Sequence, residues 1–179
     1  MRIIAVRLSD IIANNGKEDV NRYLEKFRCS KDIDLQDFLH NKAVMYENKG
    51  RSRTYLLVDT DDEDRIIGYV TLALTKITVS DRTELAKGIV RRMDLNDNET
   101  VGYLIGQMAK DDSVFKSIGG KMLSFAQNML YVSYRQNGGR AICIDCKEPM
   151  IEYYRKEGFI LVEPEPDKRN GLYRLVRLF

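Results

Sequence analysis

The stretch LIGQMAKDDSVFKSIGGKML, residues 104–123, decides the fold of this 179-residue chain. It begins as an apolar strand, is broken by two aspartates, and passes through a loop into a helix that begins near Gly119 and Gly120. Such a loop can point several backbone N–H groups at one spot, and a helix N-terminus adds about half a positive charge. The stretch therefore predicts a pyrophosphate site, to which Lys116 and Lys121 add positive charge.

On both sides of this stretch the hydrophobic pattern alternates between strands and helices. Strands at 101–109 and 141–145 with a helix at 117–135 between them imply a parallel or mixed sheet with a crossover helix. The acidic segment 59–64 reads as the tip of a hairpin. Other helices are expected at 17–27, 34–48 and 148–157, and other strands at 54–58, 65–74, 77–79, 159–162 and 172–178. Residues 1–12 form either a strand or a short helix. Residues 80–100 form a long, partly helical connection.

This order of elements predicts a single domain over residues 1–179. Its fold class is α/β or α+β, with a mixed, mostly antiparallel central sheet flanked by helices. Hydrophobic residues make up 44% and charged residues 31% of the chain, which is ordinary for a globular protein. The apolar runs are too short to span a bilayer and no secretory signal is evident, so we expect a cytoplasmic protein without a membrane partner.

The polar residues outside the central stretch suggest few catalytic groups. Cys143 and Cys146 form a lone C-x-x-C pair, and a zinc site would need a second pair of ligands. We therefore expect no metal site but a strand residue and a residue just past the strand, in a reduced compartment. His40, the one histidine, falls away from the apolar stripe of its helix and is expected to be exposed. The net charge of +2 is too small to indicate a nucleic acid partner, although Arg91 and Arg92 adjoin in one loop.

Several segments together resemble the GNAT (Gcn5-related N-acetyltransferase) family. Residues 104–111 are similar to the family's strand "LLGRLAVD", which leads into a loop of pattern Q/R-x-x-G-x-G/A and a helix. In one register, Gly119 occupies the second glycine position of the loop pattern, Ser117 the first glycine position and Val114 the Q/R position. In the ungapped register, the same three positions are occupied by Gly120, Ile118 and Phe115. Residues 151–159 resemble the family's "FYEKLGF" segment at Tyr154, Gly158 and Phe159.

The resemblance implies an acetyl-CoA-dependent N-acetyltransferase that acts on a primary amine. The implied catalytic residue is Tyr154, which in many members protonates the leaving thiolate. A tyrosine with a pKa near 10 can donate to a thiolate whose conjugate acid has a pKa near 8.5. Glu99, Asp111 and Asp112 are candidate bases by proximity alone, and water can also take the proton. The implied cofactor-binding residues are Met108, Ala109, Lys110, Lys116, Ser117, Ile118, Gly119, Gly120 and Lys121.

Three further segments resemble the GNAT branch that includes toxins of toxin–antitoxin pairs. These are Phe27–Cys29 with 35–43, then Ser52–Val58, and Ile67–Ala73. Such toxins acetylate aminoacyl-tRNA. The acceptor is therefore a small molecule, a protein amino group or aminoacyl-tRNA, and the expected protein partners are a second copy of the chain and an antitoxin. A CoA-binding module with weak or no catalysis is the alternative.

Overall fold

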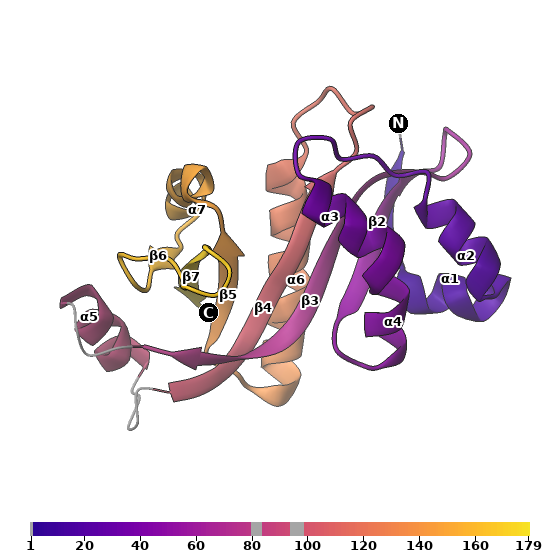
Figure 1. Cartoon of the computed structure of the whole chain (residues 1–179). Coiled ribbons are helices and arrows are strands. Elements are labelled where there is room, and N and C mark those ends of the chain that lie inside the picture. The colour runs from indigo at the N-terminus through magenta and orange to yellow at the C-terminus, as the bar shows by residue number, and fades with distance from the viewer. Residues whose placement is uncertain (1, 80–83, 94–98) are drawn as a thin grey trace. The chain divides into compact units, whose positions relative to one another are not determined.

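The computed structural model of the chain describes residues 2–79, 84–93 and 99–179. The strands are β1 (Ile3–Arg7), β2 (Arg53–Asp59), β3 (Arg65–Thr78), β4 (Glu99–Lys110), β5 (Ala141–Cys146), β6 (Ile160–Leu161) and β7 (Tyr173–Leu178). The helices are α1 (Leu8–Asn15), α2 (Lys17–Leu24), α3 (Ile33–Asp37), the π-helical turn η1 (Phe38–Lys42), α4 (Ala43–Asn48), α5 (Glu84–Met93), α6 (Gly119–Asn137), the 3-10 turn η2 (Glu148–Met150) and α7 (Ile151–Lys156) (Figure 1).

The strands join in a seven-stranded sheet in the order β1-β2-β3-β4-β5-β7-β6. The β4–β5 pair is parallel, and the β1–β2, β2–β3, β5–β7 and β6–β7 pairs are antiparallel. The mixed, mostly antiparallel sheet expected from the sequence is therefore confirmed. The chain groups into two compact units: unit 1 holds Met1–Ala73 and Gly106–Ala126, and unit 2 holds Leu74–Ile105 and Gln127–Phe179. The single domain expected from the sequence stays a prediction.

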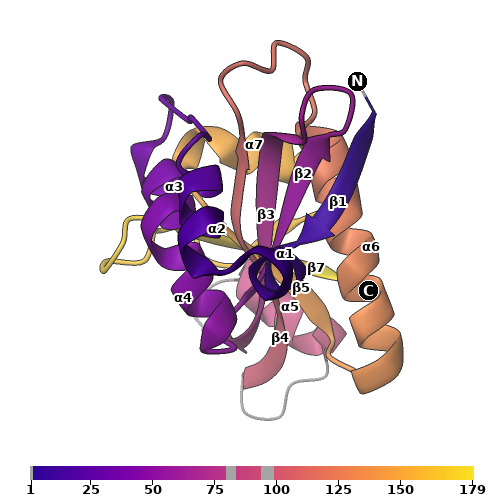
Figure 2. The ribbon, with the colours of Figure 1, turned by 90° about the vertical axis from the view of Figure 1, so that its right-hand side faces the viewer.

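In unit 1 the two faces of the sheet pack against different helices (Figure 2). Leu56 and Val58 belong to a core that also contains residues of α1, α2 and α4. Leu57, which lies between them on β2, belongs instead to a cluster with Ile118 and Met122 at the start of α6. This division follows from the alternation of side chains along a strand. It fixes the N-terminal turn of α6 against the sheet.

Gly68 on β3 allows a close approach of neighbouring backbone and side chain in unit 1. A Cβ atom built at this position would lie 2.9 Å from the carbonyl oxygen of Ala109 and 3.1 Å from Cε of Met122. Only a residue without Cβ fits between these atoms without a shift. Gly68 therefore sets the position of β4 and of α6 next to β3.

Unit 2 has its own core of small and β-branched residues around β5 and β7. In the β5–β7 ladder Cys143 faces Val176 and Asp145 faces Arg174. Both guanidinium contacts of Arg174 to the Asp145 carboxylate are 2.7 Å long. Such a bidentate pair fixes the register of the two strands.

The structure corrects several boundaries expected from the sequence. Residues 1–12 contain both a strand and the start of a helix, and the separate short strand expected at 77–79 is the end of β3. Arg91 and Arg92 lie in the last turn of α5 and not in a loop. The helix expected over 34–48 is present, but a π-helical turn interrupts it. A π turn is a local insertion of about one residue, which the hydrophobic pattern of so short a segment does not reveal.

Candidate functional site

The loop between β4 and α6 is closed by hydrogen bonds to its first residue. Asp111 is 6% exposed, and its carboxylate oxygen Oδ1 accepts from the backbone N–H of Ser113 at 2.9 Å. Its carbonyl accepts from the N–H of Val114 at 3.1 Å. The Lys110 ammonium donates to the carbonyl of Val114. Lys110, one of the expected cofactor-binding residues, thus holds the loop itself.

The N-terminus of α6 brings the other loop residues together. The N–H of Met122 donates to the carbonyl of Ile118 at 3.0 Å, so the N–H groups just before Met122 have no acceptor inside the helix. No atom lies within 4 Å of a Cβ built at Gly120, which leaves the space above it open. The exposed residues of the expected set lie within four positions of Gly120 in the chain, namely Lys116, Ser117, Gly120 and Lys121. The arrangement fits a pyrophosphate by donor type, charge and space.

Three residues of the expected set can serve a ligand only through their backbone. The side chains of Ile118 and Ala109 are 3% and 4% exposed and belong to the hydrophobic cores of unit 1. Met108 is partly buried against the cluster around Met122. Just before it, the N–H of Gln107 donates to the hydroxyl of the buried Thr71 at 2.8 Å. A side-chain acceptor thus holds the backbone of β4 at this point.

The segment Phe27–Ser30 is joined to the start of the loop by backbone contacts. The N–H of Arg28 donates to Oδ2 of Asp111 at 2.8 Å, and the Arg28 carbonyl accepts from the N–H of Asp112 at 2.9 Å. The N–H of Ser30 donates to the Asp112 carboxylate at 2.9 Å, and this contact lowers the pKa of Asp112. Hydrogen bonds therefore link the segment at Phe27–Cys29 to the loop before α6, two regions that the sequence singled out separately.

The three candidate bases are all engaged in such contacts. Asp111 and Asp112 hold backbone N–H groups, as described above. Glu99, which lies in unit 2, forms an ion pair with Lys76 at 2.7 Å. None of these carboxylates is left as an evident proton acceptor among the described residues.

Two polar residues outside the loop have structural partners. His40 was expected to be exposed, but it is half-buried in η1, and its Nε2 lies 2.9 Å from the carbonyl oxygen of Phe27. His40 lies within the π-helical turn Phe38–Lys42, where the regular helical spacing behind the expectation does not hold. Arg53 pairs with the buried carboxylate of Glu47 at 3.0 Å, and the same carboxylate accepts from the N–H of Thr54 at 2.8 Å. Arg53 thus secures the entry to β2.

Phe115 is an exposed aromatic residue of this loop to which sequence reasoning gave no role. It follows the buried Val114, and its side chain is 99% exposed. In the sequence it occupies the lead position of the loop pattern in only one of the two registers. The available signal was a single aromatic residue in a polar loop of phosphate-binding pattern. An exposed ring beside Lys116 can stack on a planar group.

Tyr154 lies in α7 of unit 2 and is 7% exposed. Its ring contacts Phe159 edge-on at a centroid distance of 6.0 Å, and the N–H of Phe159 donates to its carbonyl at 3.0 Å. Burial raises the pKa of Tyr154 well above its ordinary value, with smaller effects from Cys146 and Tyr153. The hydroxyl therefore keeps its proton at neutral pH. Tyr154 belongs to unit 2, and the loop between β4 and α6 belongs to unit 1. That both contribute to one active site therefore stays a prediction.

Cys143 and Cys146 are both buried in β5 and not joined by a disulfide. Burial raises the pKa of Cys143 to about 12 and that of Cys146 to about 11. Thiols are poor nucleophiles and poor metal ligands when protonated, which agrees with the structural role expected for this pair. No cluster of three or more metal-ligating side chains occurs in the described part of the chain. Within the described ranges, every helix is too short or too polar to cross a membrane.

No family model matches the sequence. Solved structures do match almost the whole chain. The chain is similar to AtaT complexed with acetyl-methionyl-tRNAfMet, at 18% identity and a TM-score of 0.72, over 99% of this chain and 94% of that one. It is also similar to a Tyr-to-Phe mutant of KacT, at 18% identity and a TM-score of 0.73, over 99% and 95% of the two chains.

A third similar structure is a Tyr-to-Phe mutant of the toxin AtaT bound to the C-terminus of the antitoxin AtaR and acetyl-CoA. The identity is 17% and the TM-score 0.67, over 98% of this chain and 92% of that one. The three likenesses extend from end to end of the described sheet and helices. The chain therefore has the fold of these solved proteins, which is the GNAT fold expected from its sequence.

Proposed function

We propose that this chain is an N-acetyltransferase that uses acetyl-CoA as its acyl donor. The observation that carries the proposal is the N-terminus of α6, where backbone N–H groups, two exposed lysines and open space over Gly120 meet on a GNAT fold. A helix N-terminus of this kind binds phosphate groups through its N–H groups and its dipole. No metal ion is needed for this recognition.

In this proposal the cofactor residues act in three ways. The N–H groups of Ile118 to Lys121 bind the pyrophosphate, and the ammonium groups of Lys116 and Lys121 balance its charge. The exposed ring of Phe115 stacks on the adenine ring. The backbone of Met108 to Lys110 donates to the oxygen of the thioester carbonyl, where negative charge develops during the reaction.

Bound acetyl-CoA supplies a thioester whose carbonyl carbon a neutral amine can attack. The proposed role of Tyr154 is to donate its hydroxyl proton to the departing sulfur. Its raised pKa keeps that proton available throughout the physiological range. Because Glu99, Asp111 and Asp112 already hold other groups, the proton of the amine passes to water.

The acceptor that the comparisons favour is the amino group of an aminoacyl-tRNA. AtaT, a protein of the same fold, was solved with acetyl-methionyl-tRNAfMet, and a mutant of it with the C-terminus of its antitoxin. We extend both partner classes to this chain as part of the proposal. A homodimer is the further expected assembly.

The test has two arms. Calorimetric titration with acetyl-CoA should give a binding signal that the double variant Lys116→Ala, Lys121→Ala weakens. The wild type should then transfer a labelled acetyl group to aminoacyl-tRNA. If a small amine or a protein is labelled instead, the proposed acceptor is wrong and the proposed acetyl transfer stands. Binding without transfer to any amine would leave a CoA-binding module.

A further inference from the structure

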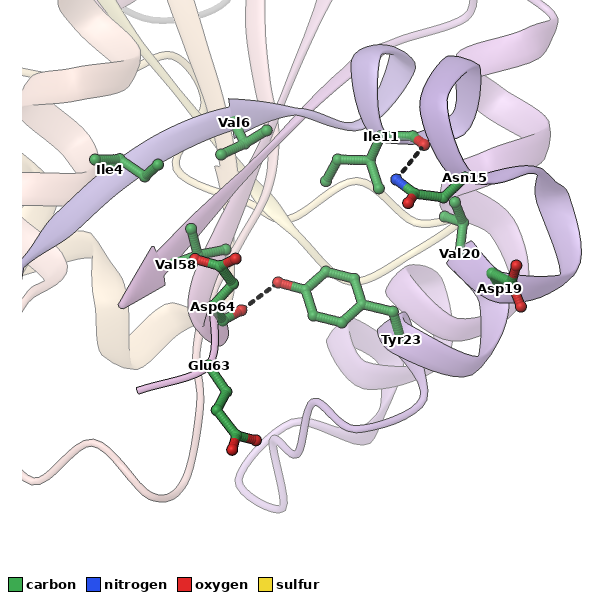
Figure 3. A pocket seen from close by; sticks show the side chains of 10 residues that line it. All are labelled: Ile4, Val6, Ile11, Asn15, Asp19, Val20, Tyr23, Val58, Glu63 and Asp64. Carbon is green, nitrogen blue, oxygen red and sulfur yellow. Dashed lines mark hydrogen bonds between the residues drawn. The ribbon is translucent and has the colours of Figure 1, made fainter. Parts of the chain in front are cut away.

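Unit 1 contains a pocket of about 420 Å³ that is separate from the loop before α6 (Figure 3). It lies where α1 and α2 meet β1, β2 and the tip of the β2–β3 hairpin. Ten residues line it, namely Ile4, Val6, Ile11, Asn15, Asp19, Val20, Tyr23, Val58, Glu63 and Asp64. None of the residues to which the proposed reaction assigns a role is among them.

The lining combines an apolar floor with an acidic rim. Aliphatic side chains supply the floor, while Asp19, Glu63 and Asp64 supply three carboxylates, and no cationic side chain lines the pocket. Asp19 pairs with the exposed Arg22, whereas Glu63 and Asp64 have no ion-pair partner among the described residues. The Tyr23 hydroxyl donates to the Asp64 carbonyl. The rim therefore favours a cation that also carries an apolar group.

The hairpin tip that carries two of these carboxylates is held in an uncommon conformation. Glu63 and Asp64 have φ values of 47° and 54°, in the left-handed region that residues other than glycine seldom adopt. Tyr23 fixes this tip from α2, and burial together with the nearby Asp64 charge raises the pKa of Tyr23 to about 12. The Tyr23 hydroxyl thus remains a donor to the Asp64 carbonyl and holds the backbone of the hairpin tip.

The pocket opens beside an unpaired strand edge. Among the described strands, β1 pairs with β2 alone. The carbonyl of Arg2 accepts from the N–H of Thr60 at 2.9 Å, so the alternation of an antiparallel ladder turns the N–H and C=O groups of Ile3 and Ala5 away from β2. A strand added at this edge would place alternate side chains on the same face as Ile4 and Val6, which line the pocket.

We propose that this edge and pocket form a docking site for an extended segment of a partner protein. The segment pairs with β1 through its backbone and places an apolar side chain and a neighbouring Lys or Arg side chain in the pocket. Charge complementarity with Glu63 and Asp64 selects this occupant. The free edge distinguishes it from a free amine, which would fill the pocket but leave the backbone of Ile3 and Ala5 without partners.

A labelled, capped peptide of sequence Thr-Ile-Thr-Arg-Thr-Ile-Thr is the probe, and fluorescence anisotropy measures its binding to the full chain without acetyl-CoA. Replacing its arginine by glutamate should weaken binding. Glu63→Lys should weaken binding about tenfold, the order of one charge-assisted contact. Glu25→Lys, at the exposed C-cap of α2 and outside the pocket lining, should change binding less than about twofold.

Ala5→Pro tests the strand edge. Proline removes the outward N–H of Ala5 and is tolerated on edge strands, so the fold should persist while the affinity falls about tenfold. Ile4→Arg, at a position that is 42% exposed, brings a positive charge to the pocket that repels the arginine of the probe and should weaken its binding. Ile33→Arg, at a position in α3 that is 62% exposed, is the matched control. Circular dichroism checks that each variant folds.

Loss of binding in Glu63→Lys, Ala5→Pro and Ile4→Arg, with both controls unaffected, supports the proposal. The absence of binding at millimolar peptide, or equal binding in all variants, overturns it. If Ala5→Pro converts a dimer to a monomer by light scattering, the occupant is a second copy and the proposed partner is wrong. If only Glu63→Lys matters, the pocket binds a free cation and strand addition is wrong.

Discussion

The backbone N–H of Arg28 donates a hydrogen bond of 2.8 Å to Oδ2 of Asp111, across 83 residues of sequence. The other carboxylate oxygen of Asp111 accepts from the N–H of Ser113. A carboxylate that is 6% exposed and saturated by backbone donors acts as a structural link between two loops. Removal of this carboxylate should therefore lower the stability of unit 1 rather than act directly on catalysis.

We expect Asp111→Ala to lower the free energy of unfolding by about 2 kcal/mol, because two partly buried hydrogen bonds to backbone N–H groups are lost. Urea denaturation measures the change. Asp112→Ala, at an exposed position, is the matched control and should have a much smaller effect. A stable Asp111→Asn enzyme with a lost acidic limb in its pH–rate profile would instead identify Asp111 as the general base.

Gly68→Ala should destabilise the chain and weaken acetyl-CoA binding together. The added Cβ would lie 2.9 Å from the Ala109 carbonyl oxygen, so β4 must shift at a cost of about 1 to 3 kcal/mol. Gly120→Ala provides the contrast, since nothing lies within 4 Å of its Cβ and the fold should tolerate it. Thermal unfolding and calorimetry on both variants measure the two effects. An unchanged Gly68→Ala variant would contradict the close approach.

Tyr154→Phe should lower kcat by about 10²- to 10⁴-fold, the usual range for a lost general acid, with acetyl-CoA affinity nearly unchanged. Because the folded pKa is raised, this acid should cause no loss of activity between pH 6 and its ordinary pKa near 10. Steady-state kinetics across that range provide the measurement.

The neighbouring Tyr153→Phe is the control for this substitution. The Tyr153 hydroxyl is buried without a hydrogen-bond partner among the described residues. Its removal should leave kcat unchanged and stability equal or slightly higher, since no bond is lost and a buried polar atom disappears. If Tyr153→Phe were the damaging change, the assignment of the acid would be wrong by one residue.

Phe115→Ala should leave stability unchanged, because the side chain is 99% exposed. If the ring stacks on adenine, acetyl-CoA affinity should fall about tenfold, within the range of a lost base–aromatic contact. Phe115→Tyr should restore binding. Equal affinities of wild type and Phe115→Ala in calorimetry would exclude this ring from the cofactor site.

Stability should decline in alkaline solution partly through Cys143. Its folded pKa is raised to about 12 from the ordinary value of 9.0, so the folded chain keeps a proton that the unfolded chain releases above pH 9. This contribution is complete below pH 9 and is lost as pH rises towards 12. Cys143→Val, which cannot ionise, should show a shallower decline in urea midpoints between pH 8 and 11. Parallel declines would contradict the assignment.

The sequence by itself determined the order of most elements and the succession of strand, loop and helix that leads into α6. Hydrophobic periodicity and the pair Gly119–Gly120 are local signals, because strand alternation and helix starts depend on residues a few positions apart. Tyr154 could likewise be placed in a short helix that ends at Gly158. These features needed no knowledge of distant contacts.

Tertiary structure alone decided which polar residues are free to act. From the sequence Asp111 is a candidate base, but in the structure its carboxylate accepts from the N–H of Arg28. Lys110 is likewise a candidate cofactor-binding residue, but its ammonium donates to the carbonyl of Val114. The acidic hairpin tip reads as a solvated turn until Tyr23 and β1 form a pocket with it. The physical reason is that burial and hydrogen-bond partners come from segments far apart in the chain, which no local pattern encodes.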